Sequence, residues 1–385
     1  MSTDVRPRVV IVVSHPGTAQ AFLLYQLELL SRTYDVSLVA NAAPEELRFL
    51  PPSVRPVSVR LVRRPSPLRD LVALVDLFRL FRRQRFALVH SMTPKAGLLA
   101  MTAAFVARVP VRLHTFMGEV WATRTGWSRW LLRQADRMTA AMATDILAVS
   151  PSELAFLRTE GVVAPEKGQV LANGSVAGVD SERFSPDPAI RRLVRRELPI
   201  RDGDVLFLYL GRLNRDKGVI TLLQAWRRLT SSTADGHLLI VGDDEAGLLK
   251  HRLVRETTRL TSLGHTWEPE RYLRAADVLC LPSRREGFGN VILEAAAAGV
   301  PAIASRIYGV VDAVVDGETG LLCAPDDVTA LAERMKTLLV DPELRHRLGE
   351  TARDRAVSMF SEETVAAALT RTYEITLRTR ATSDS

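Results

Sequence analysis

Two glutamates in the second half of the chain, Glu286 and Glu294, flank a glycine-rich turn whose composition suits a phosphate-binding site. The turn follows an apolar run, contains Gly287 and Gly289, and leads into a predicted helix that begins at about Asn290. The backbone amides at a helix start and the positive end of its dipole favour a diphosphate. Eight helical residues span about 12 Å, which suits two carboxylates on either side of a diphosphate, one accepting sugar hydroxyls and the other ribose hydroxyls.

Two cations, Arg212 and Lys217, bracket a short loop after the predicted strand 204–209. Arginine offers a planar fork that matches phosphate oxygens, and lysine offers a compact point charge. A diphosphate leaving group gains negative charge as its bond to a sugar breaks, so fixed cations beside it lower the barrier. Charged loop residues are usually only solvated. The position of this pair before Gly218 and another predicted helix favours a phosphate-binding role.

These groups need a scaffold, and the chain alternates apolar runs typical of buried parallel strands with helical patterns. The alternation predicts an α/β fold of two Rossmann-like halves, each a doubly wound parallel sheet covered on both faces. Ligands bind beyond the carboxyl ends of such strands, so two halves facing one another would enclose an interdomain cleft. The predicted strands span residues 8–14, 36–40, 88–90, 111–116 and 145–149, then 204–209, 237–241, 260–263, 278–281 and 302–304.

The boundary between the halves is predicted near residues 185–188, where the composition becomes polar and proline-rich. This gives an N-terminal domain over residues 1–185 and a C-terminal domain over residues 186–361. The remaining stretch, 362–385, is predicted to be largely helical, and its pattern alone allows packing on either half.

The positive charge of the chain is concentrated in its first half. The whole chain of 385 residues carries a net charge of +7, and by direct count residues 1–185 contain 23 Lys/Arg against 15 Asp/Glu. Such an excess is compatible with nucleic acid, an anionic membrane or an anionic substrate. Nucleic acid is not expected as a partner, because no nucleic-acid motif is present and aromatic residues make up only 6% of the chain.

The sequence predicts a cytoplasmic protein. Its longest nearly apolar run, residues 96–107, is shorter than the roughly 20 residues needed to span a bilayer. The N-terminus lacks the pattern of a signal peptide. The two cysteines, Cys280 and Cys323, lie in apolar surroundings and are interpreted as buried free thiols of a reducing compartment.

A basic amphipathic helix is predicted over residues 67–85, and two interpretations of it remain open. It could rest on an anionic membrane, where each basic residue adds on the order of 1 kcal/mol, or it could be an ordinary helix with its apolar face on the core. The apolar residues at helical spacing are Leu68, Leu71, Val72, Val75, Phe78 and Phe81, with Arg79, Arg82, Arg83 and Arg85 at one end.

The glutamate pair and the cation pair together resemble the large retaining glycosyltransferase family 4, which has the two-domain GT-B fold. The matching motifs are Gly211-Arg212 with Lys217-Gly218, and Glu286-Gly-Phe-Gly-Asn-Val-Ile-Leu-Glu294. The E-x7-E spacing is highly specific when it occurs with the Arg/Lys pair, and the resemblance extends over most of the chain. Further similar segments are residues 149–152, 173–184 and 316–322.

The resemblance implies a role for each matching residue and implies that the C-terminal helix crosses back onto the N-terminal domain. Glu286 would hold hydroxyls of the donor sugar, Glu294 those of the ribose, and Arg212 with Lys217 would neutralise the diphosphate. His114 would contact the donor sugar near the reacting carbon, or else would be a strand-end histidine satisfied by neighbouring backbone. Further implied donor contacts are Gly17 in the first strand–helix loop, Gly287, the backbone amides of Phe288, Gly289 and Asn290, and Thr266 beside the base.

Part of the first half resembles a narrower group, the bacterial capsule and O-antigen transferases that extend an undecaprenyl-diphosphate-linked sugar. Residues 89–99 and 113–122 carry this similarity. It suggests His90, Lys95 and Glu119 as acceptor contacts. Strand-end packing of His90 and a solvated Lys95 are the alternative interpretations.

Two segments depart from the family pattern. Many members have a Gly-Gly pair in the first strand–helix loop, whereas this chain has Ser14-His-Pro-Gly17 with a single glycine. The frequent Gly-Pro-Glu segment after the helix of the second glutamate is replaced by Ile307-Tyr-Gly-Val-Val311. These departures concern the diphosphate contact and the fit of the sugar or the acceptor.

The resemblance implies retention of configuration by substitution on one face of the sugar, because no obvious nucleophilic carboxylate occurs in the first half. The expected donor is a UDP-sugar, and the expected acceptor is a lipid-diphosphate-linked glycan at the inner face of the cell membrane. No cofactor and no metal are expected, and Asp202-Gly-Asp204 is interpreted as a turn. A soluble acceptor, a nucleotide-sugar epimerase of the same fold and a non-catalytic binding protein are the alternatives.

Overall fold

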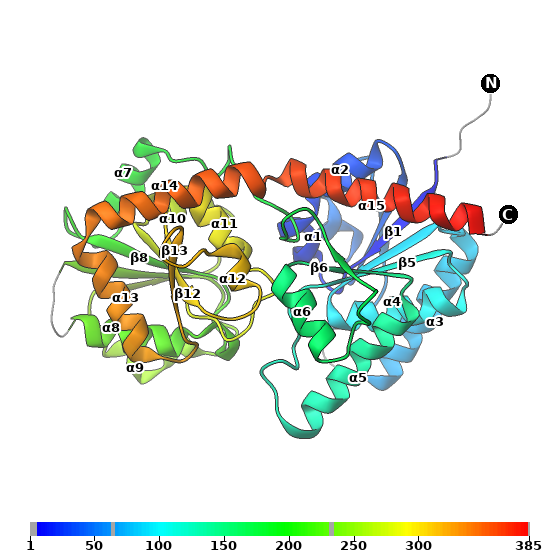
Figure 1. Cartoon of the computed structure of the whole chain (residues 1–385), viewed down its shortest axis with the longest axis horizontal. Helices are drawn as coiled ribbons and strands as arrows, with labels where there is room; N and C mark the ends of the chain where they lie inside the picture. Colours follow the sequence, from blue (N-terminus) through cyan, green and yellow to red (C-terminus); the bar gives the residue numbers. More distant parts are fainter. Residues whose placement is uncertain (1–5, 63–65, 231–234, 384–385) are drawn as a thin grey trace. The chain divides into compact units, whose positions relative to one another are not determined.

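The structure is a computed structural model that describes residues 6–62, 66–230 and 235–383, and it divides the chain into two compact units (Figure 1). Unit 1 comprises Met1–Ala177 with Glu362–Ser385, and unit 2 comprises Gly178–Ser361. Each unit is a parallel sheet with helices on its faces, so the predicted α/β architecture of two Rossmann-like domains is confirmed.

Unit 1 contains a seven-stranded sheet in the order β3-β2-β1-β4-β5-β6-β7, and all its strand pairs are parallel. The central strands β1 and β4 are buried, which explains the continuous apolar run of β1, whereas β4 buries His90 and Ser91 among its apolar residues. The strands are β1 (Arg8–Val12), β2 (Asp35–Ala40), β3 (Arg55–Ser58), β4 (Leu88–Met92), β5 (Val111–Phe116), β6 (Asp145–Ala148) and β7 (Gln169–Val170).

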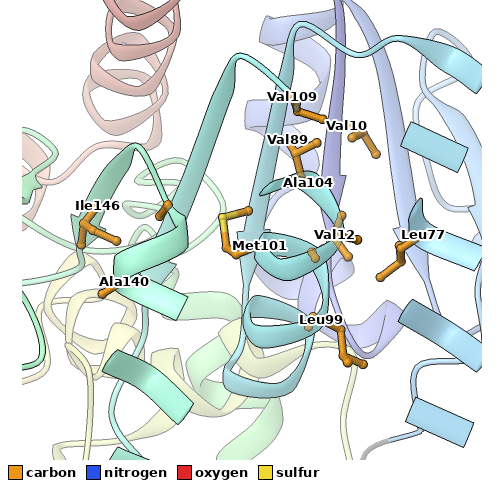
Figure 2. Close-up of a cluster of buried hydrophobic side chains, with 14 of the residues drawn as sticks. Val10, Val12, Leu77, Val89, Leu99, Met101, Ala104, Val109, Ala140 and Ile146 are labelled. Carbon is orange, nitrogen blue, oxygen red and sulfur yellow. The ribbon is translucent and has the colours of Figure 1, made fainter. Parts of the chain in front are cut away.

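Three helices cover one face of this sheet. They are α3 (Pro67–Gln84), α4 (Pro94–Val106) and α5 (Gly126–Met142), and α4 packs between the other two. Figure 2 shows the core beneath them, which contains side chains of β1, β4 and β6 and of all three helices. The other helices of the unit are α1 (Pro16–Phe22), α2 (Leu24–Ser31), η1 (Pro44–Leu47), α6 (Pro151–Thr159) and α15 (Glu362–Ser383).

The C-terminal helix α15 belongs to unit 1 through buried contacts. It packs against α2, and the hydroxyl of its Tyr373 is 2.7 Å from Nδ1 of His90 on β4. The Tyr373 ring also lies 5.9 Å, between centroids, from the ring of Tyr34. A helix from the end of the chain thus completes the core of the first sheet.

Unit 2 contains a six-stranded parallel sheet in the order β10-β9-β8-β11-β12-β13. Its strands are β8 (Val205–Leu210), β9 (Gly236–Val241), β10 (Leu260–Leu263), β11 (Val278–Leu281), β12 (Ala302–Ser305) and β13 (Gly320–Cys323). Its helices are α7 (Pro188–Glu197), η2 (Arg215–Lys217), α8 (Val219–Thr230), η3 (Leu248–Lys250), α9 (Arg252–Arg255), α10 (Pro269–Ala275), α11 (Asn290–Ala297), α12 (Val310–Ala313), α13 (Val328–Val340) and α14 (Pro342–Met359).

The division between the units falls at residues 177/178, eight residues before the boundary expected from composition. The intervening segment joins unit 2 because the amide of Val179 donates to the carbonyl of Phe360, 2.8 Å away, and Arg274 donates to the carbonyls of Arg183 and Ser185. Cys280 and Cys323 are buried and free.

Candidate active site

The two loops with the predicted chemistry follow β8 and β11, which are neighbours in the sheet of unit 2. The strand order reverses between them, since β8 leads outward to β9 and β11 leads outward to β12 on the other side. Reversals of this kind leave a crevice at the carboxyl ends of the strands, where open α/β sheets bind ligands. Lys217 and Glu286 meet at this point.

The ammonium of Lys217 is 2.6 Å from Oε1 of Glu286, and the hydroxyl of Ser283 donates to the same oxygen over 2.8 Å. Both partners of the ion pair are mostly buried. Within the part of the chain that the structure describes, Oε2 of Glu286 accepts no hydrogen bond. A lysine carries three N–H donors. The pair therefore retains N–H donors for phosphate oxygens and a carboxylate oxygen for hydroxyl groups.

Three glycines fix the site loops by close backbone contact. A Cβ on Gly218, whose φ is +69°, would lie 1.9 Å from the carbonyl oxygen of Pro282. A Cβ on Gly309 would lie 2.2 Å from the carbonyl oxygen of Gly287, and one on Gly242 would lie 2.0 Å from that of Gly211. The loops after β8, β9, β11 and β12 are thus joined into one surface that no larger residue at these positions would allow.

The guanidinium of Arg212 is held by a carboxylate from the neighbouring loop. Its Nη1 lies 3.0 Å from Oε1 of Glu245, and Asn214 donates to Oε2 of the same glutamate over 3.1 Å. The Tyr209 hydroxyl donates to the Arg212 carbonyl over 2.8 Å, and burial raises the pKa of that hydroxyl. The arginine is half-exposed, so it remains accessible to an anion.

Helix α11 begins at Asn290, as the sequence predicts. Its N-cap is Gly289, with φ of +84°, which has no side chain that could cap the first turn. Phe288 is buried against Phe360, with ring centroids 5.4 Å apart, and this contact anchors the turn that precedes the helix. The N-terminus of the helix thus opens from the same loop that carries Glu286.

Glu294 lies one turn further along α11 and is only partly exposed. Burial raises the pKa of its carboxyl group to about 7, while the positive charge of Arg183 opposes this effect and the negative charge of Glu270 adds to it. Arg183 itself pairs with Glu270 at 2.8 Å. A carboxyl group with this pKa changes charge near neutral pH.

Thr266 lies in the loop after β10, at the edge of the sheet away from the reversal point. Its hydroxyl oxygen accepts from the amide of Glu268 over 3.0 Å. The neighbouring His265 lies 3.2 Å from a carboxylate oxygen of Asp243, and its ring meets that of Trp267 edge-on. The predicted contact of Thr266 with a nucleotide base stays a prediction.

His114 lies within β5, whose span equals the predicted strand 111–116, and therefore is not a strand-end histidine. β5 continues through Phe116, and the His114 ring is buried beneath α4, where a Cβ on Gly97 would lie 2.4 Å from its Cε1. Its Nδ1 is 2.8 Å from the hydroxyl of Ser91, and burial lowers its pKa to about 3. This enclosed position does not favour the predicted contact with a donor sugar.

His90 is also an interior residue. One ring nitrogen is hydrogen-bonded to Tyr373 and the other, at 2.7 Å, to Thr115, so both are occupied by protein groups. Burial lowers its pKa to about 3. The geometry therefore supports the alternative interpretation of strand packing over the predicted acceptor contact.

The other two predicted acceptor contacts are engaged with acidic groups of unit 1. Lys95 lies 2.6 Å from Oδ1 of Asp70. Glu119 is buried beside Glu153, which accepts from the amides of Gly118 and Val149; burial and the neighbouring Glu119 carboxyl raise the pKa of Glu153 well above its usual value. Glu153 thus links the loop after β5 to the loop after β6.

The first strand–helix loop meets the start of α4 at the reversal point of the first sheet, between β1 and β4. The Ser14 and Thr93 hydroxyl oxygens are 3.0 Å apart, and Thr93 has a φ of +72°, which is strained for threonine. Gly17 is close by in sequence, and its amide donates to Nδ1 of His15 over 3.0 Å.

The Asp202-Gly-Asp204 segment forms a turn into β8. Asp204 accepts from the amide of Arg201 over 2.9 Å and also lies within 3.4 Å of the guanidinium of Arg259. In the described residues no group of three or more His, Cys, Asp or Glu side chains is arranged to hold a metal ion.

Several residues of the site were not predicted from the sequence. They are Ser283 and Gly309, which contact the glutamate turn, Tyr209 and Glu245, which hold Arg212, and Arg183 beside Glu294. Gly309 belongs to a segment already singled out, Ile307–Val311, and Ser283 lies three residues before Glu286. Glu245 carries no signal beyond lying after a predicted strand.

Comparisons with known proteins show which family each unit resembles. Residues 6–174 match the family described as glycosyl transferase 4-like domain, and residues 190–355 match glycosyl transferases group 1. The chain is 29% identical over 367 residues to the capsular polysaccharide biosynthesis glycosyltransferase CapM of Staphylococcus aureus, which covers 92% of this chain and 93% of the relative. It is 27% identical over 351 residues, 89% of each chain, to the Escherichia coli UDP-Gal:alpha-D-GlcNAc-diphosphoundecaprenol alpha-1,3-galactosyltransferase.

Among solved structures, that of Anabaena HepE in complex with UDP and glucose superimposes with a TM-score of 0.79 at 20% identity, over 96% of this chain and 99% of that one. The two family models fall one on each unit and together account for most of the chain. The chain therefore belongs to the family 4-like glycosyltransferases of the GT-B fold.

Proposed function

We propose that the chain transfers a sugar from a UDP-sugar to a hydroxyl of a glycan carried on a lipid diphosphate, with retention of configuration, during synthesis of a cell-surface polysaccharide. The observation that carries the donor part is the meeting of Lys217 and Glu286 at the sheet reversal of unit 2, beside the start of α11. The name of the E. coli relative supports the lipid-diphosphate acceptor, and that of the S. aureus relative supports polysaccharide synthesis.

Each group has a task in this proposal. Lys217 and Arg212 bind the diphosphate and stabilise the charge that develops on it as the glycosidic C–O bond breaks. Oε2 of Glu286 accepts hydroxyl groups of the donor sugar, and Glu294 accepts those of the ribose. The α11 amides add donors for phosphate oxygens.

Retention follows if the acceptor oxygen attacks from the face that the diphosphate leaves. The new C–O bond forms as the old one breaks, and the acceptor proton passes to an oxygen of the departing phosphate. The two protein cations supply charge that a metal ion would otherwise provide, so no divalent ion is expected to be needed. EDTA should leave turnover unchanged, and loss of activity that a divalent ion restores would contradict this part.

The direct test compares Lys217→Ala with the exposed-lysine control Lys250→Ala in calorimetric UDP titrations and in turnover. Lys217→Ala should lower turnover about 100- to 1,000-fold and weaken UDP binding, while the control keeps both. NMR of the product from a UDP-sugar screen with a lipid-diphosphate glycan should show the donor's anomeric configuration.

Other results would contradict the proposal. Near-normal activity of Lys217→Ala would remove the phosphate-binding role. Release of an epimerised sugar without transfer would identify an epimerase, and equal turnover on a glycan without its lipid diphosphate would identify a soluble acceptor.

A further inference from the structure

Helix α3 exposes a stripe of apolar side chains that a core-facing helix would bury. Leu68, Leu71 and Val72 are 81%, 58% and 56% exposed, and Val75 continues the stripe one turn later. The residues that α3 turns toward the core are instead Ala73, Leu77 and Phe81. The helix is therefore apolar on its inner side, and its first half also carries an apolar stripe on its outer side.

The same outer stripe becomes basic toward the end of the helix. Arg79, Arg82 and Arg83 follow Val75 at spacings of four, seven and eight residues, which keeps them on one face of an α-helix. All three are exposed, and none forms an ion pair with another residue that the structure describes. An apolar half and a cationic half thus share one surface stripe.

A second exposed stripe runs along α5. Trp127, Trp130 and Leu131 are 71%, 50% and 52% exposed, and Met138 lies on the same side two turns later. The two indole rings stack with centroids 4.5 Å apart. Tryptophan at this density on a surface is typical of the interface between water and a bilayer, where its apolar ring and its N–H are both accommodated.

The two stripes belong to one side of unit 1. α3 and α5 both pack on α4, and all three helices lie on the same face of the sheet (Figure 1). Each connects parallel strands, so each begins at the carboxyl edge of the sheet and runs back to the amino edge. The apolar first turns of α3 and α5 therefore flank the start of α4 at the edge where ligand-binding loops lie.

We propose that the α3 and α5 stripes together form a docking surface for an anionic phospholipid bilayer. The indoles and leucines enter the interface, and the arginines of α3 contact anionic headgroups. The role of this surface, which is to bring the enzyme to a lipid-linked acceptor, rests on the proposed function. The observations that support the surface itself do not depend on that function. No described helix is long and apolar enough to cross a membrane.

A bilayer fits this surface better than a second copy of the chain. The unpaired arginines form the basic half of the α3 stripe, and two copies meeting there would bring these like charges together. An anionic bilayer instead satisfies both halves of the stripe, since it offers negative headgroups above an apolar interior. A dimer remains the competing outcome of the experiment.

The test uses the full chain with Trp267→Phe, because the remaining exposed tryptophans are then Trp127 and Trp130; Trp121 and Trp226 are buried. Vesicles of phosphatidylglycerol with phosphatidylcholine should shift the emission to shorter wavelength, and brominated lipid should quench it. Vesicles of phosphatidylcholine alone should bind on the order of 100-fold more weakly, given about fivefold for each of three arginines.

Flotation of serine variants then assigns the two stripes. Trp127→Ser with Trp130→Ser, and separately Leu68→Ser with Leu71→Ser, should each lower the vesicle partition coefficient on the order of tenfold or more. Trp267→Ser, at an exposed tryptophan of unit 2, is the matched control and should bind like the wild type. All these side chains are exposed, so the variants are expected to fold.

Several outcomes overturn the proposal. The proposal fails if the wild-type chain stays unbound or binds neutral vesicles equally well. It also fails if the wild type is a dimer in lipid-free solution and the serine changes convert it to a monomer. Calorimetric UDP titration of the same variants in solution keeps the two hypotheses apart. Lost vesicle binding with intact UDP binding concerns only the docking surface, and lost UDP binding in the wild type concerns only the proposed function.

Discussion

Replacement of Glu294 by glutamine should make unit 2 more stable above neutral pH while it weakens the donor site. Burial raises the pKa of this carboxyl group from 4.5 to about 7. The protein therefore holds a proton on Glu294 in a pH range where the unfolded chain has released it. Glutamine has nearly the same shape and never ionises, so it avoids the cost of a buried charge.

The sign and size follow from proton linkage. Below pH 4.5 the glutamate is protonated in both states, and the two proteins should be equally stable. As the pH rises from 4.5 toward about 7 the unfolded state loses its proton first, so the free energy of unfolding of the wild type falls. The difference between 4.5 and about 7, at about 1.4 kcal/mol for each pKa unit, gives the variant an advantage of up to about 3 kcal/mol above pH 7.

Differential scanning calorimetry at about pH 5 and about pH 8 measures this directly. An advantage of about 3 kcal/mol corresponds to a rise of about 5–10 °C in the melting temperature of unit 2 at the higher pH, with a much smaller rise at the lower pH. The control is Glu333→Gln, at an exposed glutamate on α13 of the same unit, which should change neither value. UDP titration should show weaker binding for Glu294→Gln. A melting-temperature difference that is the same at both pH values would refute the reasoning.

Three further changes test other contacts. Gly218→Ala should lower the free energy of unfolding of unit 2 by more than about 2 kcal/mol and weaken UDP binding, because its Cβ would overlap the carbonyl oxygen of the neighbouring loop. Gly247→Ala has a similar φ of +67° but lies in open space, so it measures the cost of the backbone conformation alone in the same melting experiment. Tyr373→Phe removes a 2.7 Å partner of buried His90 and should cost unit 1 about 1–3 kcal/mol, measured by calorimetry, and an unchanged melting temperature would contradict this. Glu245→Gln should tighten UDP binding about two- to fivefold in calorimetric titration, because its carboxylate competes for the phosphate-binding arginine, whereas weaker binding would show that it orients that arginine.

The central strands of both sheets were predictable because a parallel strand buried on both faces must be a continuous apolar run. β1 and β8 show this pattern, and each lies within a residue or two of its expected bounds. β3, β7 and β13 were missed for local reasons. β3 is a mostly exposed edge strand with a proline, β7 has two residues, and β13 is a short run directly after a turn.

Helical periodicity identified α3 but not the direction in which it faces. Its sequence has two apolar stripes, one through Leu68, Leu71 and Val72 and another through Leu77 and Phe81, and both satisfy the spacing of an amphipathic helix. Which stripe is buried depends on the position of α4 and the sheet, which the local pattern does not contain. The prediction from the sequence therefore assigned residues of both stripes to a single apolar face.

Motif spacing placed Arg212, Lys217 and Glu286 in loops that follow buried strands, and the structure has them there; their contact with a donor stays a prediction. It did not predict the enclosure of His114, since the strand pattern has no local signal for the close approach of Gly97. Contacts between loops, such as that between Arg212 and Glu245, depend on strand order, and a single sequence does not specify which strand exits are neighbours.

The two site cations differ in the carboxylates that hold them, and this difference suggests how a diphosphate enters. Lys217 pairs with Glu286, which is largely buried and also bonded to Ser283, so this pair is fixed to the floor of the site. Arg212 pairs with Glu245 at the half-exposed rim, where an ion pair contributes little and exchanges readily. An arriving diphosphate can therefore displace Glu245 at small cost, while Glu286 stays beside Lys217 and keeps an oxygen for the sugar. Both cations lie in the loop after β8, so in the proposed function one loop would carry the exchangeable and the fixed contacts of the diphosphate.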